Sequence, residues 1–329
     1  MELASESKQI IEKLYHGRTH VELSIGILKD GVVEMVHLGP DGNRKEGESL
    51  VYPAGSICKI FTASLFAKYL AEGRLELEAP LSRHIHGLPE QYYPSLRKLA
   101  THSSGYAGKP YSTWDAMKML LRMNAPDGLF RVNPYHGTVK ESDMMRILAE
   151  THLKDRPYKF QYSNLGMSVL GYIVGQVSGQ GFWDGMETYI REELGLKTAR
   201  LGNTDMLGYD KKDQPCGCWQ WDKSDMIAPA GALLASVEDL LDFARQHLDG
   251  SKPYLEICHK QHGPGEKGFV SGLAWRLEQS TDISWHDGAA GAYSAFVGLD
   301  RKKKTAVALA VNYGLVDTKE LAFSILNTL

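Results

Sequence analysis

The feature that most constrains the fold is that strand-like sequences lie at both ends of the chain, with helical sequences between them. Near the N-terminus, residues 21–27 alternate apolar and other side chains, and residues 32–38 run back after the turn Lys29-Asp30-Gly31, which predicts a β-hairpin. The strands predicted near the C-terminus are Gly272 to Glu278, Asp282 to His286, Ala292 to Asp300 and Thr305 to Asn312. We therefore expect one antiparallel sheet built from the two termini.

Helical sequences fill most of the rest of the chain. The apolar run that follows residue 59 predicts a buried helix ending near Gly73. Ser236 stands as a helix N-cap with Asp239 three residues on, a variant of the capping box. The further predicted helices are residues 5–16, Asp115 to Met123, Ser142 to Glu150, Leu165 to Val177, Phe182 to Leu194, Val237 to Leu248 and 317–329. The expected fold class is α/β, of the α+β type, in which helices flank the antiparallel sheet and an all-helical domain is inserted.

The stretch Tyr52-Pro53-Ala54-Gly55-Ser56-Ile57-Cys58-Lys59 is predicted to be a loop that leads into a helix, with Ser56 as N-cap or first-turn residue. Ser56 and Lys59 are three residues apart, so on a helix their side chains share a face. A desolvated lysine can help to take the proton of a serine nucleophile. S-x-x-K also occurs at Ser5 and Ser95, but only the copy at Ser56 opens a long apolar helix. The alternative is a capped core helix.

A second motif is the single Y-x-N of the chain, Tyr162-Ser163-Asn164. A phenol held near a lysine ammonium would be pushed towards phenolate, which would make Tyr162 a general base for a serine. Asn164 would offer its carboxamide to Lys59 or to a substrate amide. In isolation, a Y-x-N motif would more simply be a buried tyrosine before a helix.

A third motif is His286-Asp287-Gly288, which small residues follow. Small residues would let a substrate backbone lie against a strand edge. H-x-G also occurs at His37, so order and context must decide between the two copies. One further histidine, His102, lies before a helix stop at Gly105, and there a structural role beside a turn is the simpler interpretation.

Composition excludes several classes of partner. The net charge of −3 and the isoelectric point near 6.5 favour neither nucleic acid nor an anionic membrane. The chain shows no leader pattern and no apolar run of about 20 residues, so we expect a cytoplasmic protein, or an exported one if a leader has been removed. The cysteines lack the spacing of a zinc site and are expected to be reduced thiols; they are Cys58, Cys216, Cys218 and Cys258.

Taken in order, S-x-x-K at Ser56, Y-x-N at Tyr162 and H-x-G at His286 resemble the serine β-lactamase/penicillin-binding superfamily. The closest resemblance is to its class C β-lactamase-like group, which includes D,D-peptidases, D-amino-acid amidases and esterases. Three other segments resemble motifs of that family: residues 99–106, 193–198 and 229–243. The resemblance implies an α/β sandwich domain (1–79 and 205–329), a helical domain (80–204) and an active site in the cleft between them.

Residue by residue, the resemblance implies that Ser56 is the acylated nucleophile and that Lys59 and Tyr162 share the proton transfer. Backbone N–H groups of Ser56 and Ala289 would form the oxyanion hole. The substrate-binding residues it implies are Asn164, His286, Asp287, Gly288 and Asn312.

Two departures from the family pattern bear on specificity. His286 stands where class C β-lactamases have a lysine, and Asp287 replaces the usual threonine. Both put efficient β-lactamase activity in doubt, because they remove a positive charge and add a negative one. We therefore expect substrates whose end near this strand is neutral or cationic.

The sequence thus predicts a serine hydrolase that forms an acyl-enzyme without a metal or organic cofactor. The expected partner is a small-molecule or short-peptide substrate, with D-configured amides or peptides ahead of esters and β-lactams. Acyl transfer to another acceptor, or a non-catalytic module for sensing or scaffolding, are the alternatives. The sequence leaves the oligomeric state open.

Overall fold

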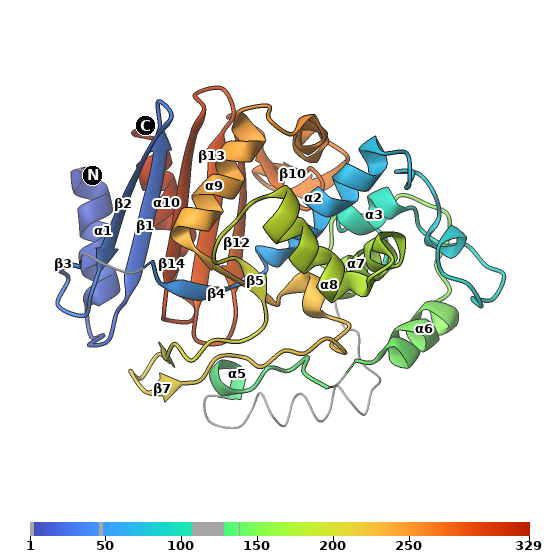
Figure 1. The fold of residues 1–329 in the computed structure, drawn as a ribbon, viewed down its shortest axis with the longest axis horizontal. Helices are drawn as coiled ribbons and strands as arrows, with labels where there is room; N and C mark the ends of the chain where they lie inside the picture. The colour runs from blue at the N-terminus through green and yellow to red at the C-terminus, as the bar shows by residue number, and fades with distance from the viewer. Residues whose placement is uncertain (1–2, 46–48, 107–127, 138) are drawn as a thin grey trace.

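A computed structural model describes residues 3–45, 49–106, 128–137 and 139–329. Within them, segments from both termini form a nine-stranded antiparallel sheet in the order β3-β2-β1-β14-β13-β12-β11-β10-β9 (Figure 1). Its strands are β1 (Leu23–Lys29), β2 (Val32–Leu38), β3 (Arg44–Lys45), β9 (Gly263–Glu266), β10 (Phe269–Ser271), β11 (Arg276–Glu278), β12 (Ile283–Ala289), β13 (Ser294–Asp300) and β14 (Thr305–Val311). The N-terminal β1 pairs with the C-terminal β14 from Leu23 to Leu28.

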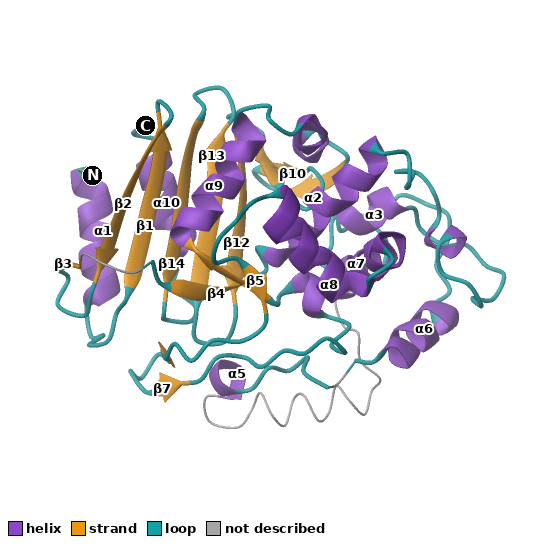
Figure 2. Ribbon diagram, in the orientation of Figure 1, coloured by secondary structure: helices purple, strands orange, loops and turns teal. Residues whose placement is uncertain are grey.

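Helices cover both faces of this sheet. α1 (Ser5–Tyr15) and α10 (Thr318–Leu326) pack on one face and enclose an apolar core with β1, β13 and β14. α9 (Val237–Leu248) lies across the other face (Figure 2). Gly26 of β1 allows α9 to come close, because a Cβ there would lie 2.5 Å from a side-chain atom of Leu241.

The remaining helical elements are α2 (Cys58–Ala71), η1 (Leu81–Arg83), α3 (Leu96–Ala100), α5 (Gly128–Arg131), α6 (Glu141–Glu150), α7 (Asn164–Ser178), α8 (Gly181–Thr188), η2 (Tyr189–Glu193), η3 (Ala228–Ala230) and η4 (Pro253–His259). Of these, α2, α3, α7 and α8 lie together beside the β10 end of the sheet (Figure 1). Two small sheets complete the fold: β4 (Val51–Gly55), β8 (Leu233–Ser236) and β5 (Arg200–Leu201) form one, and β6 (Gly208–Tyr209) and β7 (Pro215–Cys216) form the other. None of the described helices is both long enough and apolar enough to span a bilayer.

The structure confirms the predicted fold class. Strand β2 and helix α9 have the predicted bounds, and the four cysteines are buried thiols. The predicted helix Asp115 to Met123 lies outside the described residues. The division into domains at residues 79/80 and 204/205 stays a prediction; the structure places β5, just before the second boundary, in the small sheet with β4 and β8.

The prediction of one strand from Gly272 to Glu278 is wrong for its first half. Leu273 N–H donates to the Cys258 carbonyl and Ala274 N–H to the Ala100 carbonyl, at 3.0 and 2.9 Å. These bonds fold the apolar residues into the core as a turn, and only Arg276–Glu278 remain as strand β11. Alternation of side chains cannot distinguish such a buried turn from a strand.

The prediction of a loop before the S-x-x-K motif is also wrong. Val51–Gly55 is strand β4, which pairs with β8 and shifts register between Pro53 and Gly55. Proline is tolerated at such an irregularity because the missing N–H is not needed there.

The predicted capping box is half correct. Ser236 Oγ accepts a hydrogen bond from Asp239 N–H at 3.1 Å, as an N-cap should. The Asp239 carboxylate does not reach back to Ser236. It accepts hydrogen bonds from three consecutive backbone N–H groups. They belong to Lys197, at 3.1 Å, to Thr198, and to Ala199, at 2.7 Å. A buried carboxylate thus fixes residues 197–199 to the start of α9.

This arrangement predicts that Asp239→Ala will lower the free energy of unfolding by about 3 kcal/mol, because it leaves buried N–H groups without an acceptor. The matched control is Asp242→Ala on the same helix, where the carboxylate makes a surface ion pair with Arg245 and should contribute less than about 1 kcal/mol. Urea denaturation of the two variants would measure the difference. Equal losses would contradict this role of Asp239.

Candidate active site

Ser56 lies at the junction of β4 and α2, where its side chain is partly exposed. α2 begins at Cys58 and its flanking residue is Ile57, so the prediction of Ser56 as the N-cap is wrong. Ser56 Oγ instead lies 2.9 Å from Lys59 Nζ and accepts a hydrogen bond from the Tyr162 hydroxyl at 2.8 Å. The structure therefore brings together the three residues predicted to carry catalysis.

Lys59 is fully buried because α2 docks on η3. Its Nζ donates to the Ala230 carbonyl at 2.7 Å, and two neighbouring side chains of α2 donate to the other carbonyls of η3. Burial lowers the pKa of Lys59 from 10.5 to about 7, and the positive charge of Arg276 acts in the same direction. A substantial share of this amine is then neutral near pH 7 and can accept a proton.

Tyr162 behaves differently from the prediction. Burial raises the pKa of its phenol above the usual 10, although the hydrogen bond to Ser56 opposes this shift. Lys59 Nζ lies 4.8 Å from the centre of the Tyr162 ring, but burial of the phenol decides the direction of its shift. The predicted shift towards phenolate is therefore wrong, and the geometry makes Tyr162 a hydrogen-bond donor to Ser56.

His102 holds the backbone on both sides of Tyr162. Gln161 N–H donates to the His102 carbonyl at 2.8 Å, and Ser163 N–H donates to His102 Nδ1 at 3.2 Å. The rings of His102 and Tyr162 lie 4.7 Å apart. Burial holds the pKa of His102 well below 6.5, so the imidazole is neutral. The structural role predicted for His102 is thus more specific than expected, because this residue positions Tyr162.

Asn164 is the first residue of α7. Its Nδ2 donates to the Tyr135 hydroxyl at 2.9 Å, whereas its buried Oδ1 has no hydrogen-bond partner among the described residues. The partners of Lys59 Nζ there are Ser56 and Ala230. A substrate N–H would satisfy the Oδ1 acceptor. Of the two predicted roles for Asn164, the structure favours binding a substrate amide over orienting Lys59.

Strand β12 brings the C-terminal part of the chain against Ser56. A Cβ at Gly288 would lie 2.0 Å from the Ala54 carbonyl oxygen, and one at Gly55 would lie 2.4 Å from the Ala289 carbonyl oxygen. Glycine at both positions permits this close approach of backbones. Ala289 therefore lies beside the residue that precedes Ser56, as a shared oxyanion hole requires. The hole itself stays a prediction.

His286 is almost completely buried in the middle of β12. Its Nδ1 donates to the Asp287 carbonyl at 2.6 Å, and its ring centre lies 6.5 Å from that of Tyr162. Burial, and after it the charge of Arg276, lower the pKa of His286 to about 3. The side chain at this position is neutral, as the sequence analysis expected.

Arg276 is a charged residue of the site that the sequence analysis missed. It forms an ion pair with Asp287, and its guanidinium carbon lies 5.9 Å from the centre of the Tyr162 ring. Burial opposes ionisation of Asp287, but Arg276 outweighs it and lowers the pKa of this carboxyl. The negative charge expected at Asp287 is therefore present, but Arg276 pairs with it, which the sequence did not predict. The available signal was a single arginine in an apolar stretch next to the H-x-G strand.

Asn312 is 2% exposed and belongs to the frame of the sheet. Its Oδ1 accepts Glu22 N–H at 2.8 Å, and its Nδ2 donates to the carbonyls of His20 and Leu207 at 2.9 and 3.3 Å. These bonds use both N–H groups of Nδ2 and one lone pair of Oδ1, and the side chain is almost completely buried. The structure gives Asn312 a structural role in place of the predicted one.

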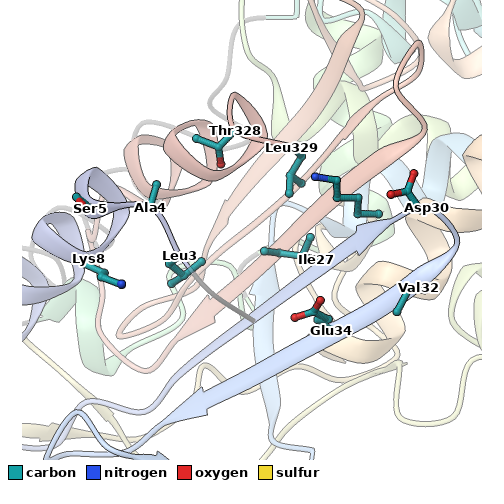
Figure 3. Close-up of a pocket in the computed structure, with 11 residues that line it drawn as sticks. Leu3, Ala4, Ser5, Lys8, Ile27, Asp30, Val32, Glu34, Thr328 and Leu329 are labelled. Carbon is teal, nitrogen blue, oxygen red and sulfur yellow. The ribbon is translucent and has the colours of Figure 1, made fainter.

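Two other features of the described residues do not belong to this site. A groove of about 710 Å³ lies between α1, the C-terminus and the β1–β2 hairpin (Figure 3), and none of the predicted site residues lines it. His136, Asp222 and Asp225 could together hold a metal ion. However, Asp225 already accepts hydrogen bonds from His136 Nδ1 and from the backbone N–H groups of Gly137 and Asp222. Those bonds account for the cluster without an ion.

Comparisons with known proteins agree with this geometry. The family model described as Beta-lactamase matches residues 8–328. Protein flp of Staphylococcus aureus is 22% identical over 342 residues, which cover 95% of this chain and 63% of that relative. The chain thus spans less than two thirds of the length of the relative.

Two solved structures have the same fold. A class C β-lactamase from Rhodobacter sphaeroides matches with a TM-score of 0.78 at 17% identity, over 99% of both chains. A β-lactamase/D-alanine carboxypeptidase from Pseudomonas syringae matches with a TM-score of 0.74 at 18% identity, over 98% of both chains. At these identities the likeness concerns the fold alone.

The pKa of Lys59 predicts how the reactivity of Ser56 depends on pH. Lys59 must be neutral to accept the serine proton, so phosphonylation of Ser56 by a fluorophosphonate should become faster as pH rises through about 7. Below that pH the rate should fall about tenfold per unit. Intact mass against time, from pH 5 to 9, would measure this. Lys59→Arg, whose side chain stays charged, should be slow throughout; a flat wild-type profile would contradict the assignment.

The contacts of His102 predict a rescue experiment. His102→Leu removes the acceptor for Ser163 N–H and should slow labelling of Ser56 by roughly tenfold to a hundredfold, because Tyr162 is no longer held. His102→Asn should recover most of the rate, since asparagine offers an acceptor and tolerates the positive φ of 53° at this position. In both variants the pH midpoint set by Lys59 should not move. Equal losses in the two variants would show that the contact to Ser163 does not position Tyr162.

Proposed function

Because this chain belongs to the beta-lactamase family, we propose that it is a serine hydrolase that acts through a covalent acyl-enzyme. One observation carries the proposal: Ser56 Oγ lies within 3 Å of both a buried lysine amine with a pKa of about 7 and a protonated tyrosine hydroxyl. A serine in a capped core helix would need neither neighbour. Lys59 in particular is fully buried without a carboxylate among its described hydrogen-bond partners, an arrangement that disfavours its charged form.

The geometry supports the following sequence of steps. Ser56 Oγ attacks the substrate carbonyl carbon while its proton passes to Lys59 Nζ. Backbone N–H groups of Ser56 and Ala289 stabilise the oxyanion of the tetrahedral intermediate. The proton then moves through the Tyr162 hydroxyl to the leaving group as the scissile bond breaks, which leaves an ester on Ser56. Water adds to this ester with Lys59 as base, and the acid is released as Ser56 recovers its proton.

We propose small amides or peptides with a D-configured residue as the substrates. The free Oδ1 of Asn164 supports an amide, because it would accept the substrate N–H beside the scissile bond. The D-configuration rests on the family, one of whose solved structures is named a β-lactamase/D-alanine carboxypeptidase. Esters, β-lactams and acyl transfer to an acceptor other than water are the alternatives within the same machinery. A non-catalytic sensor or scaffold is the alternative of another class.

Covalent labelling tests the proposed nucleophile. Incubation with a fluorophosphonate or a slow β-lactam should add one adduct mass to the intact protein, located on the peptide that contains Ser56. The matched control is Ser95→Ala, which removes the serine of another S-x-x-K copy and should not change labelling. Labelling that persists in Ser56→Ala would refute the assignment.

Turnover of a substrate panel tests the reaction. The purified protein should release amine from N-acyl-D-alanyl amides faster than from their L-isomers, and added amine acceptors should not divert the acyl group. Product formation that requires an acceptor would show acyl transfer. A labelled protein that turns over none of the amides, esters or β-lactams would favour the sensor alternative.

A further inference from the structure

The Arg276–Asp287 ion pair joins β11 and β12 beside the edge where the leaving-group side of a substrate held at Ser56 would extend. Asp287 precedes Ala289 by two residues on β12, which is about 7 Å along an extended strand. That distance corresponds to about two residues of a bound substrate. The close packing of Gly55 on Ala289 fixes β12 against the nucleophile. Groups at position 287 would therefore meet the leaving-group side of a substrate, within about two residues of the scissile bond.

Arg276 is held in place by several contacts at once. Its guanidinium carbon lies 4.6 Å from the centre of the Trp285 ring and 5.7 Å from that of Phe269, distances at which a cation is attracted to an aromatic face. One of its N–H groups donates to the Asp287 carboxylate. The Arg276 side chain is 18% exposed, whereas that of Asp287 is 50% exposed.

Arg276 also supplies the positive charge that His286 lacks. His286 is neutral and buried, and the Arg276 guanidinium carbon lies 5.9 Å from the centre of the Tyr162 ring. One small buried space is lined by the side chains of Arg276, His286 and Tyr162, together with those of His102 and Phe160. A guanidinium offers five donors in a planar fork that matches a carboxylate. The Arg276 guanidinium is therefore suited to bind a carboxylate. In this structure it binds the carboxylate of Asp287.

We propose that Asp287 determines specificity by occupying Arg276, so that the protein selects substrates that are uncharged next to β12 and discriminates against those with a free carboxylate there. This inference rests on the proposed function, because it names the substrate class of the same site. It also gives a different physical reason why substrates with a free carboxylate are disfavoured. Asp287 does not only repel a substrate carboxylate; it takes the place that the carboxylate would otherwise fill.

Masking of Arg276 by Asp287 and simple repulsion by Asp287 predict different behaviour of variants. If Asp287 masks Arg276, then Asp287→Asn should raise kcat/KM for N-acyl-D-alanyl-D-alanine, relative to the matching terminal amide, by at least tenfold. The gain should disappear in Asp287→Asn/Arg276→Gln, because no guanidinium remains to bind the carboxylate. Simple repulsion by Asp287 would leave the gain intact in the double variant. The matched control is Asp242→Asn, which removes the carboxylate of a surface Asp–Arg pair on α9 and should leave the ratio unchanged.

A binding measurement makes the test independent of turnover. The protein for this measurement carries Ser56→Ala, and isothermal titration gives the Kd values of N-acyl-D-alanyl-D-alanine and of its terminal amide. The ratio of these two Kd values should shift by at least tenfold in favour of the free acid when Asp287→Asn is added, and should return when Arg276→Gln is added as well. Circular dichroism and thermal melting would show which variants are folded. If Asp287→Asn is unstable, Asp287→Thr provides the same removal of charge.

The outcomes separate this inference from the proposed function. No labelling of Ser56 and no turnover, with a Kd ratio that still shifts by tenfold, would refute the hydrolase and retain the selectivity. Labelling and turnover with an unchanged ratio in Asp287→Asn would retain the hydrolase and overturn the selectivity. A wild-type preference for the free acid, or a gain that persists without Arg276, would also overturn it.

Discussion

The burial of Lys59 is the physical constraint on which the rest of the site depends. An amine that is completely removed from water favours its neutral form unless a counter-charge holds the proton. Its described hydrogen-bond partners are a hydroxyl and a carbonyl, and neither carries a charge. The docking of α2 on η3 therefore gives Lys59 the properties of a base near neutral pH, and the described side-chain partners of Ser56 Oγ include neither a carboxylate nor an imidazole. The lowered pKa of Lys59 thus follows from the packing of α2 on η3.

The other titratable groups around Ser56 are consistent with that base. Burial keeps Tyr162 protonated and His286 neutral, so both can serve as hydrogen-bonding groups without adding charge next to Lys59. The formal charges of Arg276 and Asp287 are paired with each other. A second uncompensated cation would lower the pKa of Lys59 further, and an uncompensated anion would raise it. The ion pair therefore keeps the net electrostatic effect on the pKa of Lys59 small, because its two charges act in opposite directions.

The sequence predicted correctly that Ser56, Lys59 and Tyr162 lie together, because they occur in short motifs whose order along the chain is specific. Strands and helices with clear alternation or periodicity, such as β2 and α9, were also predictable. What escaped prediction depends on tertiary contacts. The carbonyl of Ala230 has no side-chain signal, Asn312 looks like a pocket residue until its backbone partners are known, and the turn at Leu273 has the composition of a strand. The ionisation of Tyr162 was mispredicted because burial of the phenol, which raises its pKa, depends on tertiary packing.

The position of the site also ties catalysis to the completion of the fold. Ser56 comes from β4, early in the chain, and Ala289 from β12, more than two hundred residues later. The two backbones approach so closely that glycine is needed at 55 and 288. Such long-range contacts form late, because the loop between them must first be closed. Lys59 and Ser56, by contrast, belong to one local segment and meet as soon as α2 forms. An incompletely folded chain would therefore contain Ser56 and Lys59 side by side but lack strand β12, to which the proposed oxyanion hole and substrate edge belong, so the proposed activity would depend on the native sheet.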